Sequence, residues 1–213
     1  MNMDGMGNTD IPALKPAMAA DEIVLLKRLL MGAKSYLEFG CGGSTLLAVQ
    51  SPVERIWSVE SDAGWIEKLG RHPDIAAAQA SGRLTLVRAD IGPTGAYGRP
   101  KPGKRLRYLW PVHVGKWSSY HEAIWSLEGP AAADLVLVDG RFRVASALAV
   151  IEHCAPHTMV AIHDFAIRSR YAPVLEFFDT IETVRNLVLL RAKAGIDPVI
   201  LTAAQRAYRY NPD

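Results

Sequence analysis

The chain has 213 residues, of which 49% are hydrophobic and 22% charged, and its formal net charge is +2. These values are ordinary for one globular domain with a full core, and no apolar run approaches the roughly 20 residues needed to span a bilayer. The two cysteines are too few for a disulfide framework or a cysteine-rich zinc site. We therefore expect a single cytoplasmic domain over residues 1–213 with no membrane partner, in which residues 1–12 form a flexible tail.

Strand-like and helix-like segments alternate along the chain. Strands are expected at 35–39, 55–59, 83–88, 133–138 and 159–162, and two closing strands at 184–190 and 198–202, joined at Gly195. Helices are expected at 16–31, 44–51, 62–69, 116–127, 142–153 and 169–178. This alternation predicts an α/β fold with a doubly wound, seven-stranded, mostly parallel sheet and a reversed strand at its C-terminal edge.

The first strand runs into a glycine turn, Glu38-Phe39-Gly40-Cys41-Gly42, and Ser44 is expected to cap the helix that follows. Glycines let the backbone turn with positive φ and come close to a ligand, and the first N–H groups of a helix favour anionic or hydrogen-bonding atoms. Such a turn is typical of nucleotide or nucleoside binding at the carboxyl edge of a parallel sheet. A dinucleotide fingerprint would have a third glycine where Thr45 stands.

Each of the first five strands carries an acid at or near its carboxyl end. These acids are Glu38, Glu60, Asp90, Asp139 and Asp164. Carboxylates that recur along one edge of such a sheet are difficult to explain by folding alone, and ligands bind at that edge in this architecture. The pattern therefore predicts a binding site across the ends of the strands.

With these residues the chain resembles the class I S-adenosylmethionine-dependent methyltransferases, which have a Rossmann-like fold. The resemblance covers roughly residues 18–202. It implies that the glycine turn, with its neighbours, holds the amino-acid end of S-adenosyl-L-methionine. It also implies that Glu38 holds the ammonium group through water or backbone, Glu60 the ribose hydroxyls and Asp90 the adenine amino group, with Ile91 beside the ring. The cofactor-binding set is then Glu38, Gly40, Cys41, Gly42, Ser44, Thr45, Glu60, Asp90, Ile91 and Asp139.

Asp139-Gly140 and His163-Asp164 resemble a subgroup of small bacterial methyltransferase domains, many of which methylate oxygen. Asp139, His163 and Asp164 are therefore the candidate catalytic residues. A histidine can accept a proton near neutral pH, and either carboxylate could hold a divalent cation, so whether a metal takes part is left open. The alternative is that the two aspartates only cap loops and helix starts.

Residues 91–118 form a basic insertion or lid. Arg99, Lys101, Lys104, Arg105, Arg107 and Lys116 lie in it, with no acidic residue. It could close over an acidic substrate, or be a passive solvated loop, or grip single-stranded RNA through its interleaved aromatic residues. The other helices at the sheet edge have no matching basic stripe, which favours a small-molecule acceptor over a nucleic-acid partner.

The sequence therefore predicts methyl transfer from S-adenosyl-L-methionine to the oxygen or nitrogen of a small, anionic or hydroxylated acceptor. Two other classes stay open. One is an NAD-type oxidoreductase, since Gly40, Gly42 and Glu60 also suit NAD, and the other is a non-catalytic cofactor-binding module. Cys41 could be a nucleophile at a helix start, or only a small residue in a crowded turn. The closing hairpin offers an edge through which a homodimer could form.

Overall fold

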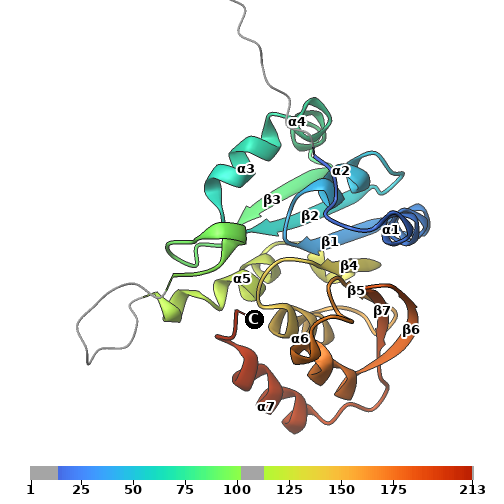
Figure 1. Cartoon of the computed structure of the whole chain (residues 1–213), viewed down its shortest axis with the longest axis vertical. Coiled ribbons are helices and arrows are strands. Elements are labelled where there is room, and N and C mark those ends of the chain that lie inside the picture. Colours follow the sequence, from blue (N-terminus) through green and yellow to red (C-terminus); the bar gives the residue numbers. More distant parts are fainter. Residues whose placement is uncertain (1–13, 102–112, 213) are drawn as a thin grey trace, which may run out of the picture.

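A computed structural model describes residues 14–101 and 113–212. Its seven strands form one sheet in the order β3-β2-β1-β4-β5-β7-β6 (Figure 1). They are β1 (Ser35–Phe39), β2 (Arg55–Glu60), β3 (Leu84–Arg88), β4 (Leu135–Val138), β5 (Met159–Ile162), β6 (Phe178–Val184) and β7 (Leu187–Ala192). Only β7 runs against its neighbours β5 and β6, so the predicted mostly parallel sheet with one reversed strand is confirmed.

Helices cover both faces of the sheet (Figure 1). One face is covered by α1 (Ala20–Gly32), α2 (Gly43–Val49), α3 (Ala63–Gly70) and α4 (Pro73–Ala80). The other is covered by α5 (Ser119–Glu122), α6 (Arg143–His153), α7 (Pro198–Tyr208) and the 3-10 helices η2 (Val114–Lys116), η3 (Ala123–Ser126) and η5 (Ser169–Glu176). Two short 3-10 turns, η1 (Ala96–Gly98) and η4 (Pro130–Ala132), lie in the loops.

Side chains of the central strands alternate between two hydrophobic cores. In β4, Val136 and Val138 pack into one core, and Leu135 and Leu137 pack into the other. This follows from the two-residue period of a strand, and β4 is apolar on both faces because helices bury both. No described helix is long and apolar enough to cross a membrane.

The end of the chain differs from the prediction. Residues 198–202 belong to helix α7 and not to a strand, and the predicted strand 184–190 crosses the turn between β6 and β7. The Asp197 side chain accepts a hydrogen bond from the Val199 amide, 2.8 Å away, and Pro198 occupies the first helical position. This pair is a strong helix-start signal, and it outweighs the β-branched residues that follow it.

Three other predictions of local structure were wrong in detail. Residues 169–176 form a 3-10 helix with Pro173 inside it, and 116–127 is divided among η2, α5 and η3. Proline removes a helix hydrogen bond, which limits η5 to this irregular form. Ser44 does not cap α2, because Gly42 is the cap residue and the Ser44 side chain points to Glu38 instead.

The turns after β1 and β4 touch each other through glycines. Gly40 has φ +102°, and a Cβ built on it would lie 2.6 Å from the Gly140 Cα. A Cβ on Gly140 would lie 1.9 Å from the Tyr120 hydroxyl oxygen and 3.0 Å from the Gly40 Cα. Only glycine lets these two backbones approach so closely, which brings the ends of two central strands together.

We predict that Gly140→Ala lowers the free energy of unfolding by about 1–3 kcal/mol, because the new methyl group overlaps Tyr120 and the Gly40 backbone. Chemical denaturation of the purified variant would measure this. The matched control is Gly115→Ala, since a Cβ at Gly115 meets no atom within 4 Å. Equal stability of the two variants would contradict the close packing of the turns.

Candidate functional site

Glu38 is a fully buried carboxylate under the glycine turn. It accepts hydrogen bonds from the hydroxyls of Tyr36 (2.9 Å), Ser44 (2.7 Å), Ser58 (2.7 Å) and Thr45. Burial raises the pKa of Glu38, and the four hydroxyls oppose that rise. With its oxygens taken by these hydroxyls, Glu38 holds β1, β2 and the start of α2 in one arrangement, and it can reach a ligand only through them.

The same network fixes the turn itself. The Thr45 hydroxyl donates to Glu38 and accepts from the Gly42 amide, 2.9 Å away, so this N–H is not free for a ligand. The Trp65 indole donates to the Cys41 carbonyl at 2.8 Å. The turn is thus held from both sides before any ligand binds.

Cys41 lies in this turn as a buried thiol. Burial, together with the charges of Glu60 and Glu38, raises the pKa of Cys41 well above its usual range. The thiolate is the reactive form of cysteine, so this environment disfavours a nucleophilic role. The structure favours the reading of Cys41 as a small residue in a crowded turn.

Glu60, at the end of β2, is held through one oxygen. Its Oε1 accepts from the amides of Ser61 (2.6 Å) and Asp62 (3.0 Å) and from the Ser61 hydroxyl (3.1 Å). Its Oε2 lies 3.9 Å from the Cys41 sulfur, beside the glycine turn. The carboxylate is therefore oriented by its own loop, and its second oxygen, Oε2, points toward the glycine turn after β1.

Asp90 and Ile91 follow β3. Asp90 is exposed and forms an ion pair with Lys116 at 2.7 Å, while the Gly92 amide donates to its other oxygen at 3.1 Å. The hydrogen bond from the Lys116 ammonium group is the largest of the effects that lower the pKa of Asp90. Ile91 is completely buried in the core. The structure thus adds a lysine to the predicted adenine site, a contact that the sequence reading did not include.

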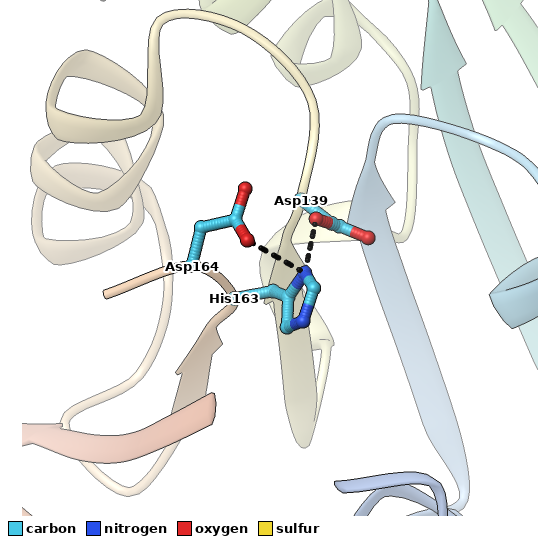
Figure 2. Close-up of side chains that lie close together, drawn as sticks. All are labelled: Asp139, His163 and Asp164. Atoms are coloured by element: carbon cyan, nitrogen blue, oxygen red, sulfur yellow. Dashed lines mark hydrogen bonds and ion pairs between the residues drawn. The ribbon is translucent and has the colours of Figure 1, made fainter. Parts of the chain in front are cut away.

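The three candidate catalytic residues come together at the ends of β4 and β5 (Figure 2). The His163 Nδ1 lies 2.9 Å from an Asp139 oxygen and 3.8 Å from an Asp164 oxygen. The side chain of His163 is 7% exposed, against 23% for Asp139 and 20% for Asp164. The two carboxylates, and not the imidazole, are the members that solvent or a substrate can reach.

The other ring nitrogen of His163 meets a carboxylate that the sequence reading missed. Glu22, in the first turn of α1, is 1% exposed, and its Oε2 lies 3.3 Å from the His163 Nε2. Burial alone would lower the pKa of His163, but the hydrogen bond that its ring donates to Asp139 and the charges of Asp139, Asp164 and Glu22 outweigh this effect, and the pKa is raised. With a carboxylate on each nitrogen, His163 is best satisfied as the doubly protonated imidazolium.

Arg143 joins the two loops from the other side. Its guanidinium is buried, donates to the backbone carbonyls of Asp139, Gly140 and His163, and lies 3.3 Å from an oxygen of Asp139 and of Asp164. Arg168 pairs with Asp164 at 2.9 Å. A positive charge in the first turn of α6 interacts unfavourably with the helix dipole. This unfavourable placement is the feature of the sequence that could have indicated a special role for Arg143.

One ligand atom from each of Asp139, His163 and Asp164 lies within 4.8 Å of the others, which is a spacing that a metal ion could use. The protons of His163, Arg143 and Arg168 already point at these oxygens. A cation bound there would have to displace them and repel three positive groups. This arrangement does not fit a resident metal ion, and we assign no step to one.

The described part of the segment 91–118 approaches Glu60 and Arg141. A Cβ on Gly98 would lie 3.6 Å from a Glu60 oxygen, and the Arg141 Nε donates to the Tyr97 carbonyl at 3.0 Å. Tyr97 has a positive φ of 56°, as do Phe142 (54°) and Asp164 (59°), and such strain is common around functional sites. Lys104, Arg105 and Arg107 of the predicted lid, and residues 1–12 of the predicted tail, lie outside the described residues.

We predict that stability depends on pH through His163. Its pKa is raised in the folded state, so its contribution is complete below its ordinary value of 6.5 and is lost as pH rises through the folded-state pKa. The free energy of unfolding should fall more between about pH 6 and about pH 9 in the wild type than in His163→Gln.

Urea unfolding across this pH range would measure the difference. His157→Gln, which removes an exposed histidine, serves as the control and should keep the wild-type pH profile. If His163→Gln has that same profile, the imidazolium assignment is wrong.

No family model and no curated protein sequence matches the chain. Solved structures do match it. A methyltransferase-like protein from Silicibacter pomeroyi superposes with a TM-score of 0.78 at 29% sequence identity, over 93% of this chain and 98% of that one. A putative O-methyltransferase from Klebsiella pneumoniae matches with a TM-score of 0.53 at 17% identity, over 87% of this chain and 85% of that one.

An O-methyltransferase from Bacillus cereus, solved in complex with SAH, matches with a TM-score of 0.54 at 12% identity, over 86% of this chain and 84% of that one. The last two likenesses, at low identity, show the fold alone. Together these structures confirm the predicted resemblance to the class I methyltransferases.

Proposed function

We propose that this chain, which has the class I methyltransferase fold, transfers a methyl group from S-adenosyl-L-methionine to a small, anionic or hydroxylated acceptor. The cofactor would lie across the carboxyl ends of β1, β2 and β3. Glu60 would bind the ribose hydroxyls, Asp90 the adenine amino group, and the turn around Gly40 the amino-acid end. Asp139 would lie beside the transferred methyl group.

One observation carries this proposal. A glycine turn that is already rigid faces a carboxylate on the neighbouring strand, and that carboxylate keeps one oxygen, Glu60 Oε2, 3.9 Å from the Cys41 sulfur. The buried network of Glu38 holds the turn in this position. The two neighbouring hydroxyls of a ribose need a hydrogen-bond acceptor that is held in place, as Glu60 is. A turn that is already ordered can bind a ligand without a further loss of backbone entropy.

The residues at the ends of β4 and β5 would then act on the acceptor. S-adenosyl-L-methionine supplies an activated methyl group on its sulfonium, so the protein mainly has to align the attacking atom, which can contribute about 7–11 kcal/mol. Of the three candidates, His163 is buried, its pKa is raised, and Asp139 is oriented by His163 and Arg143. Asp139, acting with His163, would orient a hydroxyl acceptor and receive its proton.

We predict that S-adenosylhomocysteine raises the melting temperature of the protein. At one hundred times its dissociation constant it should stabilise the fold by about 2.7 kcal/mol. Glu60→Ala should lose most of this shift, because the ribose contact is removed. The control is Glu54→Ala, which changes an exposed glutamate just before β2.

NADH in place of S-adenosylhomocysteine tests the oxidoreductase alternative in the same assay. We expect that NADH does not change the melting temperature and does not compete with S-adenosylhomocysteine. A shift that Glu60→Ala leaves unchanged would refute the ribose assignment, and a larger shift with NADH would favour the dehydrogenase.

We predict that Asp139→Asn lowers turnover of any acceptor by about 100-fold or more. It should weaken the binding of S-adenosylhomocysteine much less, because Asp139 is only one of the residues expected to contact the cofactor. Release of S-adenosylhomocysteine across a panel of hydroxylated acids would measure turnover. Asp134→Asn is the control, since Asp134 caps the other end of β4 through the Ser35 and Lys34 amides. A variant with undiminished turnover would remove Asp139 from the reaction.

If the chain were a non-catalytic cofactor-binding module, neither the wild type nor Asp139→Asn would show turnover in that assay.

The cytoplasmic location, the lack of a nucleic-acid partner and the homodimer stay predictions.

A further inference from the structure

The buried ion cluster at the ends of β4 and β5 is balanced in charge. Three carboxylates take part, Glu22, Asp139 and Asp164, and three cations pair with them, His163, Arg143 and Arg168. Any further positive charge next to this cluster therefore has no carboxylate of the cluster left to neutralise it.

Arg141 is such a charge. It follows the Asp139-Gly140 turn and is half-buried. Its backbone amide donates to the Tyr120 hydroxyl at 3.3 Å, and its Nε donates to the Tyr97 carbonyl at 3.0 Å. Within the described residues, no carboxylate forms an ion pair with its guanidinium, whereas Arg143 pairs with Asp139 and Asp164, and Arg168 pairs with Asp164.

The surroundings of Arg141 are positive. Burial lowers its pKa, and the nearby guanidinium groups of Arg143, Arg99 and Arg168 lower it further. A half-buried cation among other cations is costly, and an anion that binds there removes the cost. Because the Nε is anchored, the plane of the guanidinium is fixed, and its two terminal nitrogens can serve both oxygens of a carboxylate or phosphate.

The position of Arg141 indicates which ligand would carry the anionic group. On one side its Nε reaches Tyr97, next to Gly98 and Glu60 at the proposed ribose site. On the other side, Asp139 is two residues away in the chain and stands at the reaction centre. A group bound to Arg141 would thus lie between the nucleoside and the catalytic carboxylate, where a methyl acceptor has to enter.

We propose that Arg141 binds an oxyanion group of the methyl acceptor, so that the substrate is a carboxylic acid or a phosphate. This inference rests on the proposed methyl transfer and deepens it, because it names the acceptor class and the residue that selects it. The same chemistry has a second source, the carboxylate of the cofactor itself, and the experiment distinguishes the two.

The test measures melting temperature with benzoate and inorganic phosphate as probes and benzamide as the neutral isostere, at constant ionic strength. Each probe is added to the free protein and to the protein saturated with S-adenosylhomocysteine. In the saturated wild type we expect each anion to raise the melting temperature by about 3 °C at roughly ten times its dissociation constant, and benzamide to have no effect. Arg141→Gln should lose the anion effect and keep the S-adenosylhomocysteine effect.

Two further variants make the result specific. Arg141→Lys keeps the charge but not the paired donors, and should retain only part of the benzoate effect. Arg55→Gln removes an exposed arginine at the amino end of β2, on the opposite edge of the sheet, and should behave as the wild type. The retained S-adenosylhomocysteine effect also shows that Arg141→Gln is folded.

Anion effects that are equal in the wild type and Arg141→Gln, or absent from the wild type, would overturn the proposal. So would a loss of S-adenosylhomocysteine affinity in Arg141→Gln with the benzoate effect intact, because Arg141 would then hold the carboxylate of the cofactor. If S-adenosylhomocysteine did not change the melting temperature of the wild type, but benzoate raised it in a way that depends on Arg141, the methyl-transfer function would be overturned. Arg141 would then belong to an anion site of another kind.

Discussion

A buried, neutralised set of charges at the ends of β4 and β5 is the constraint on which the site depends. Arg143 binds three backbone carbonyls of the two loops and lies against the carboxylates of Asp139 and Asp164. A buried charge without its partner is strongly destabilising, so no member of the set can leave without cost to the others. The chain therefore cannot fold around this cluster without also placing Asp139 at the edge of the sheet.

A second buried acid acts in the same way on the neighbouring strand. Glu38 takes four hydroxyl hydrogen bonds and thereby fixes the turn after β1, while the glycine contact between Gly40 and Gly140 ties that turn to the end of β4. The inner acids thus organise the backbone. The outer groups, Glu60, Asp139 and Asp164, keep part of their surface accessible, and this division is what a binding edge requires.

The elements across this edge come from distant parts of the chain. Glu22 lies in the first helix, yet it contacts His163, just after β5, and accepts a hydrogen bond from the Asn186 amide beside β7. Lys116 pairs with Asp90, and Arg141 donates to Tyr97, so the basic segment is joined both to the proposed nucleoside end and to the loop that carries the proposed catalytic Asp139. Cofactor and acceptor would therefore meet the same segment, which couples their positions.

The sequence by itself determined the alternation of strands and helices, the glycine turn and the row of acids at strand ends, because periodicity, turn chemistry and strand length are local properties. It could not place α7, where the Asp197-Pro198 helix start competed with β-branched residues. Only the tertiary structure decided what each acid does. An acid in the first turn of α1, such as Glu22, is indistinguishable in sequence from one that serves the helix dipole. Which carboxylates are buried, which cations neutralise them and which arginine is left over depend on contacts between residues up to 164 positions apart, and no local pattern encodes them.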